Sequence, residues 1–224
     1  MLLRSRATTP IRRLTRGAAT DATSVYLPSL LRFGGGCSST LPAALAQFEL
    51  KRPMLVTDPY IAQSGMLEPI KTALVEAGTS FSIFDQCVPD PTTETIAAGL
   101  AAWEAAGQPD CLVGVGGGSS IDSAKAMAIL AGVDRPLRDF KMPAQPEPGL
   151  PVIAIPTTAG TGSEVTKASI VTDVETNEKM LCMGRGLMPT MYAFSELDPS
   201  TGRAAVALTQ RHPQPTPSPC SVLA

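Results

Sequence analysis

The sequence is poor in several features that often reveal function. Its 224 residues include one histidine, His212, and only 4% aromatic residues. No stretch approaches the roughly 18 consecutive apolar residues that a membrane-spanning helix needs. Beyond the first twenty residues, no basic cluster indicates a nucleic-acid surface. We therefore expect neither a membrane nor a nucleic acid among the partners of this chain. The lone histidine also argues against a Ser-His-Asp hydrolase.

Cysteines are few and widely separated. Neighbouring cysteines in the sequence are at least 24 residues apart, so there is no C-x-x-C metal motif and no dense disulfide framework. We expect free and mostly buried thiols at Cys37, Cys87, Cys111, Cys182 and Cys220.

The amino-terminal segment differs in charge from the rest of the chain. It carries five arginines among Leu, Ile, Ser and Thr, and no acidic residue precedes Asp21. Without these five, 13 of the 18 basic residues remain against 20 acidic ones. This composition is typical of an organellar transit peptide, so we expect residues 1–24 to direct the protein to mitochondria. A plastid address, or a basic leader without an address on a cytoplasmic protein, is the alternative.

The body of the chain alternates short apolar runs with helical patterns, as a parallel sheet with crossover helices does. This order predicts a Rossmann-like α/β domain over residues 25–198. Strands are predicted over 53–58, 81–85, 110–115 and 151–156, and helices over 41–50, 64–78, 92–107 and 120–132. In the segment 199–224, proline occupies alternate positions from Pro213 to Pro219, which denies the backbone regular hydrogen bonds. We expect that segment to be a disordered tail.

A glycine-rich stretch follows the third predicted strand and opens a helix. It reads "GVGGGSSIDSAKA" over residues 114–126. Free amides at a helix amino terminus favour a phosphate, and glycines allow close approach and any positive φ that the turn requires. Ser119 and Ser120 are expected to add hydroxyl donors and to cap the helix. The stretch is neither G-x-G-x-x-G nor a P-loop, and a tight turn without a ligand is the alternative.

A second loop of small and hydroxyl-bearing residues follows the fourth predicted strand. It reads "IPTTAGTGSEVTKASIVTD" over residues 155–173. Loops that follow neighbouring parallel strands meet at the carboxyl edge of the sheet, where such folds bind their ligands. Together, the two loops predict a site for a dinucleotide pyrophosphate.

The order of these motifs resembles one enzyme family. "LVTD", "VPDPT", "GGGSSIDSAKA" and "PTTAGTGSEVT" occur in the same order in the cofactor-binding half of iron-containing (group III) alcohol dehydrogenases. The resemblance implies their dehydroquinate synthase-like α/β fold and hydride exchange between NAD and an alcohol or aldehyde. Maleylacetate reductases and hydroxyacid–oxoacid transhydrogenases share the motifs, so a hydroxyacid or oxoacid substrate is an alternative.

The resemblance also implies roles for individual residues. Asp58 matches an acid at the adenosine ribose, where a carboxylate accepts from the 2′-OH and repels a 2′-phosphate, which favours NAD over NADP. Without the resemblance, Asp58-Pro59 is read as the start of a turn. Asp90 stands where the family usually has asparagine near the cofactor. Asp122 either belongs to the cofactor site or only caps and braces the following helix. The remaining matches are Gly117, Gly118, Ser119 and Ser120 at the pyrophosphate, Thr157, Thr158 and Thr161 at the nicotinamide, and Lys179 at the nicotinamide ribose.

The metal site that the resemblance implies has no counterpart in this sequence. Family members hold iron or zinc with one Asp and three His on a carboxyl-terminal helical domain, whereas this chain has one histidine. We therefore expect that domain to be absent and catalysis to be impaired. Two alternatives stay open, a nucleotide-binding module without catalysis and a half-protein that completes its site with another chain. The sequence leaves the substrate and the oligomeric state open, a homo-oligomer included.

Overall fold

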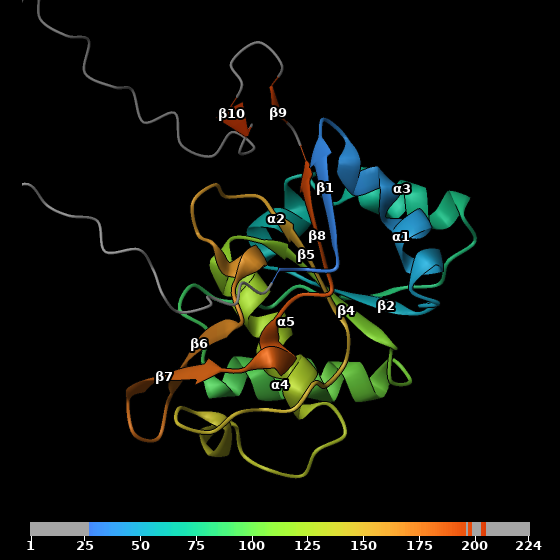
Figure 1. Cartoon of the computed structure of the whole chain (residues 1–224). Helices are drawn as coiled ribbons and strands as arrows, with labels where there is room; N and C mark the ends of the chain where they lie inside the picture. The colour runs from blue at the N-terminus through green and yellow to red at the C-terminus, as the bar shows by residue number, and fades with distance from the viewer. Residues whose placement is uncertain (1–26, 196, 199–202, 205–224) are drawn as a thin grey trace, which may run out of the picture.

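The structure is a computed structural model that describes residues 27–195, 197–198 and 203–204. The expected transit peptide over 1–24, most of the expected tail over 199–224, and His212 lie outside the described residues. The described chain forms a six-stranded sheet in the order β1-β8-β5-β4-β2-β3, with every neighbouring pair parallel. Helices cover both faces of this sheet (Figure 1). The prediction of a Rossmann-like α/β domain is confirmed.

All four predicted strands are present, with ends within two residues of the predicted ones. They are β2 (Pro53–Val56), β3 (Ser82–Phe84), β4 (Cys111–Gly116) and β5 (Val152–Pro156). Two further strands of the six-stranded sheet were not predicted, β1 (Leu30–Gly34) and β8 (Met191–Ser195). β1 is an edge strand and only partly buried, which explains why its sequence lacks the continuous apolar run of the central strands.

The four predicted helices are also present, and a fifth was missed. The predicted ones are α1 (Leu41–Gln47), α3 (Glu68–Glu76), α4 (Thr93–Ala105) and α5 (Gly118–Leu130). The missed helix, α2 (Pro59–Gln63), begins at Asp58-Pro59, which without the resemblance was read as the start of a turn. Asp58 is its N-cap and Pro59 its first residue, a combination that starts a helix as readily as a turn.

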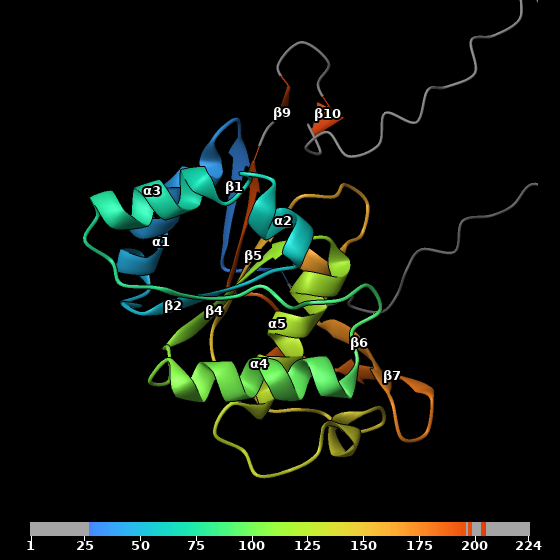
Figure 2. The ribbon, with the colours of Figure 1, turned by 180° about the vertical axis from the view of Figure 1, so that it is seen from behind.

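Alternate residues of the central strands face two separate cores. On one face, Leu55, Val113 and Ile153 pack with the buried side chains of α1 and α3. On the other face, Leu112 and Val152 pack with α4 and α5. This period-two alternation is what a sheet covered on both faces requires, and Figure 2 shows the two helical layers on either side of the strands.

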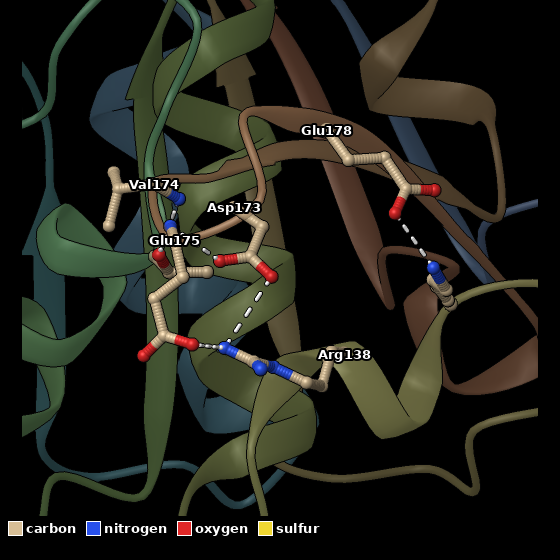
Figure 3. A network of polar contacts seen from close by, with 7 residues as sticks. Arg138, Asp173, Val174, Glu175 and Glu178 are labelled. Atoms are coloured by element: carbon tan, nitrogen blue, oxygen red, sulfur yellow. Dashed lines mark hydrogen bonds and ion pairs between the residues drawn. The ribbon is translucent and has the colours of Figure 1, made fainter.

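A small antiparallel hairpin of β6 (Ala168–Asp173) and β7 (Glu178–Met183) lies beside α5. Charged side chains tie it to η2 (Leu137–Phe140), as Figure 3 shows. Arg138 lies 3.5 Å from the buried carboxylate of Asp173 and also pairs with Glu175. Lys141 Nζ lies 2.8 Å from Glu178 Oε2. The hairpin is therefore fixed to the α4–α5 layer rather than to the main sheet.

The remaining described elements are short. They are η1 (Cys37–Thr40), η3 (Ser163–Val165), η4 (Arg185–Leu187), β9 (Leu197–Asp198) and β10 (Arg203–Ala204). Among the helices of the described part, none has the length and apolar character to span a bilayer.

Candidate functional site

A groove of about 650 Å³ lies at the carboxyl edge of the sheet. Four segments form it, and each follows a strand of the sheet: the residues after β2, those after β3, the glycine loop after β4 (residues 116–120) and the threonine loop after β5 (residues 157–168). Seven of the residues predicted to bind cofactor line it: Asp58, Gly117, Gly118, Ser119, Ser120, Thr157 and Thr158. The carboxyl edge is where α/β folds bind ligands, so geometry and prediction agree on the location.

The glycine loop leaves amides free at the start of α5. Ile121 N donates to Gly117 O at 3.3 Å, so the amides of the helical residues before Ile121 have no carbonyl of the helix to bond. The positive φ of this turn belongs to Gly116, at 145°, and not to Gly117, whose φ is −74°. The loop thus presents backbone donors and a positive helix end to the groove.

The prediction that the two serines cap α5 is wrong, because Gly117 is the N-cap. Each serine instead joins the glycine loop to another segment. Ser120 Oγ donates to Asp58 Oδ2 at 3.4 Å, and Ser119 Oγ accepts from Asp90 N at 3.3 Å. The hydroxyls therefore tie the glycine loop to the segments that follow β2 and β3.

The Asp58 carboxylate caps a helix and also lines the groove. Its Oδ1 accepts from Ile61 N at 2.9 Å and caps α2, while its Oδ2 lies toward Ser120 in the groove wall. Just before it, the buried hydroxyl of Thr57 donates to Val115 O at 2.7 Å and holds the ends of β2 and β4 together. One carboxylate oxygen is thus fixed by the helix and the other remains available to a ligand.

The threonine loop packs directly against the glycine loop, as predicted. Thr157 N donates to Gly116 O at 2.9 Å. A Cβ placed on Gly117 would lie 3.5 Å from Thr158 Oγ1, and one placed on Gly118 would lie 3.4 Å from Thr161 Cβ. The absence of side chains at Gly117 and Gly118 is therefore what keeps the groove open between the loops.

Asp122 and Thr161 support the threonine loop and do not line the groove. The Asp122 carboxylate accepts from Ser163 Oγ and, at 3.1 Å, from Ile170 N. It thus braces the loop and β6 rather than capping its own helix. Burial raises the pKa of Asp122, and the hydrogen bonds from Ser163 and Ile170 oppose that shift. Thr161 Oγ1 donates to Glu164 Oε2 at 3.2 Å.

Asp90 and Lys179 form an exposed ion pair outside the groove lining, with 3.0 Å between Asp90 Oδ1 and Lys179 Nζ. The pair joins the segment after β3 to β7, and Asp90 N contacts Ser119 from the same side. Asp90, predicted near the cofactor, and Lys179, predicted at the nicotinamide ribose, are therefore in direct contact, and Asp90 links them to the glycine loop.

Cys87 is the one thiol in the groove lining, and it is almost fully buried. Burial raises the pKa of Cys87 to about 12, so the side chain is a protonated thiol near neutral pH. It contributes packing to the groove rather than a nucleophile.

Lys125 is the most deeply buried charged residue of this region, and the sequence analysis missed it. Its side chain is 0% exposed, and it donates to backbone carbonyls of the threonine loop. In the structure every position of α5 from Ser123 to Leu130 is buried, so a lysine within that run has no route to solvent.

A metal site does not fit the residues that the structure describes. Within them, no group of three His, Cys, Asp or Glu side chains could hold an ion. The single histidine of the sequence lies in the part that is not described.

A parallel sheet with a glycine loop, a helix amino terminus and a groove at its carboxyl edge defines an α/β protein of the nucleotide-binding type. The family described as "Iron-containing alcohol dehydrogenase" matches residues 28–195. This chain belongs to that family, as the resemblance of its motifs implied.

Three relatives illustrate the match. Alcohol dehydrogenase 4 of Schizosaccharomyces pombe is 33% identical over 84% of this chain and 44% of its own length. The NAD-dependent methanol dehydrogenase of Bacillus methanolicus is 33% identical over 75% of this chain and 44% of its own length. The structure of sulfoacetaldehyde reductase from Bifidobacterium kashiwanohense in complex with NAD+ has a TM-score of 0.70 and 27% identity, over 77% of this chain and 46% of that one. This chain thus spans less than half the length of these relatives.

Proposed function

We propose that the groove binds NAD, in preference to NADP, and that this chain supplies the cofactor-binding part of an NAD-dependent alcohol dehydrogenase. The observation that carries the proposal is the groove itself, in which a side-chain-free loop at a helix amino terminus faces a threonine loop, with Asp58 at one side. The NAD-dependent methanol dehydrogenase and the NAD+ complex among the relatives support the choice of dinucleotide.

The residues of the groove suit the parts of a dinucleotide. Unpaired amides at the start of α5 bind the pyrophosphate, and Gly117 and Gly118 leave room for it beside Thr158 and Thr161. Asp58 Oδ2 accepts from the 2′-OH of the adenosine ribose and repels a 2′-phosphate. Thr157 and Thr158 line the nicotinamide side, with Thr161 behind them and Lys179 beyond. When bound, the nicotinamide supplies the position that accepts or gives a hydride.

The proposed substrate class is a small alcohol or aldehyde, with a hydroxyacid or oxoacid as the alternative. The family name points to iron, but the described residues do not fit such a site. A site with three imidazole ligands also cannot come from one chain with a single histidine. We therefore expect no metal-dependent turnover from this chain by itself. Assays with NAD, ferrous iron and a panel of short alcohols test this, and NADH production that a chelator abolishes would contradict it.

Cofactor preference is tested by Asp58→Ser, because serine also caps helices and so keeps α2 while removing the charge. Calorimetric titration of the wild type should give NAD binding at least about tenfold tighter than NADP, which corresponds to about 1.4 kcal/mol. In Asp58→Ser the ratio should fall toward one. Tighter NADP binding by the wild type, or no binding of either dinucleotide, would contradict the proposal.

We further propose that residues 1–24 direct the protein to mitochondria. The support is compositional, namely five arginines and no acidic residue before Asp21. A fusion of residues 1–24 to a fluorescent reporter should enter mitochondria. The fusion carrying both Arg12→Glu and Arg13→Glu should stay in the cytosol. A wild-type fusion that remains cytosolic would refute targeting by residues 1–24. One that enters plastids would show that the target is the plastid and not the mitochondrion.

A further inference from the structure

Lys125 lies inside the protein, on the side of α5 that faces the threonine loop. Its Nζ donates to the carbonyl oxygens of Ser163, of Thr166 at 2.8 Å and of Ala168 at 2.9 Å. An ammonium group has three N–H donors, and here each has a backbone carbonyl. The lysine therefore gives one donor to each of three carbonyls from residue 163 to 168, and the Ser163 carbonyl also accepts from Thr166 Oγ1 at 3.5 Å.

Two carboxylates complete the surroundings of this ammonium group. Asp122, one turn earlier on α5, and Glu164, on η3, are the charged side chains that act on Lys125. Burial lowers the pKa of Lys125 to about 8, and both carboxylates oppose that shift. Both also bond to the loop, Asp122 through Ser163 and Glu164 through Thr161. Removal of Lys125 would thus leave three carbonyls and two carboxylates without their cation.

The threonine loop is consequently fixed at both ends. At its start, Thr157 N bonds to Gly116 O at 2.9 Å. At its end, from residue 163 to 168, the bonds go to Lys125. Between these two anchors lie Thr158, in the groove wall, and Thr161, against Gly118. The separation of the two loops, and with it the width of the groove, depends on the second anchor as much as on the first.

We infer that Lys125 is a positioning residue for the dinucleotide groove: its buried ammonium group holds the threonine loop at the distance from the glycine loop that the ligand requires. The inference rests on the proposed function for its ligand. The ordering of residues 157–168 by Lys125 is measurable without any ligand. The inference about Lys125 and the proposed function can therefore be refuted separately.

The first test compares Lys125→Met with the wild type and a control. Methionine keeps the length and apolar stem of the side chain but has no donor. Ile70→Val is the control, because Ile70 is a buried residue of α3 in the core on the opposite face of the sheet. Hydrogen exchange of the unliganded protein should be at least about tenfold faster over residues 157–168 in Lys125→Met. It should be unchanged there in Ile70→Val. Equal loop exchange in Lys125→Met and the wild type would overturn the inference.

The second test is NAD affinity, measured by calorimetry on the same proteins. Lys125→Met should raise the Kd at least about tenfold, whereas Ile70→Val should leave it within twofold. A faster-exchanging loop with an unchanged Kd would overturn the positioning role. A wild type that binds no NAD would refute the proposed function, and the exchange result would still decide whether Lys125 orders the loop.

The third test needs only the wild type, so it holds even if Lys125→Met does not fold. Loss of a proton leaves the side chain with two donors for three carbonyls. NAD affinity should therefore fall as the pH rises through about 8, the folded-state pKa of Lys125. Cys87, the thiol of the groove, stays protonated in this range because its pKa is about 12. A flat affinity profile between pH 7 and about 9.5 would contradict the inference.

Discussion

The two loops that form the groove are built in different ways. The glycine loop takes its shape from its own backbone, with a positive φ at Gly116 and no side chains from Gly116 to Gly118. The threonine loop has hydrogen bonds of its own, such as Val165 N to Gly162 O, and is held against α5 by Asp122 and Lys125. The small residues of both loops are visible in the sequence, whereas the contacts that hold the threonine loop join residues about 40 positions apart.

The largest effect on NAD affinity is expected from a side chain added to the glycine loop at a position whose backbone conformation accepts one. Gly117 has φ −74° and ψ −174°, an extended conformation that valine adopts, and the nearest atom to its Cβ is 3.5 Å away. Gly117→Val should therefore fold, but fill the space between the loops. We expect NAD affinity to fall at least about 100-fold by calorimetry, with the melting temperature nearly unchanged. Undiminished binding by the folded variant would show that the loop is only a turn.

At the adjacent glycine, a substitution should instead lower the stability of the protein. At Gly116 the φ of 145° is unfavourable for any other residue, and a Cβ would lie 2.6 Å from Ser120 Oγ. Gly116→Ala should lower the free energy of unfolding by about 1–3 kcal/mol, as urea denaturation would measure. Equal stability of Gly116→Ala and the wild type would contradict the view that backbone conformation sets the shape of this loop.

A smaller effect, on stability and hydrogen exchange, is expected when the threonine loop loses a hydrogen bond to Asp122. Asp122→Asn keeps the size of the side chain, but its NH2 group cannot accept, so either Ser163 Oγ or Ile170 N loses its acceptor. Unfolding free energy should fall by about 1–2 kcal/mol. Hydrogen exchange should rise over residues 157–170 and stay constant over 114–120. If the glycine loop loosened equally, the two loops would not be independently supported.

The smallest effect is expected at the exposed rim. The side chains of Asp90 and Lys179 are 74% and 62% exposed, so their ion pair is worth less than about 1 kcal/mol. Asp90→Asn releases Lys179, whose charge then attracts the dinucleotide. NAD binding should tighten by about two- to fivefold at low salt, and the gain should vanish at high salt. A gain that persists in high salt would indicate a specific contact of the new amide.

Much of the fold and of the groove could be predicted from the sequence, because the decisive signals are local. Four apolar runs became β2, β3, β4 and β5, which include three of the four inner strands of the sheet, and the glycines after β4 marked the glycine loop. Strand β8 and the partners of Asp122 could not be predicted, since they depend on segments distant in the chain. Lys125 was missed for the same reason. A lysine is buried only where acceptors bind its ammonium group, and here these acceptors are carbonyls from a distant segment.

The strand order of the sheet has a kinetic consequence. Among the described strands β1 comes first in the sequence, and it pairs with β8, where Leu30 lies opposite Met191. During synthesis, the sheet can form from β2, β3, β4 and β5 with their crossover helices before β8, the partner of β1, has been made. Such long-range pairings form late because loop closure must come first. Of the described strands, the one that is synthesised first is therefore among the last to be incorporated. Until then its backbone edge is exposed to chaperones and to neighbouring nascent chains.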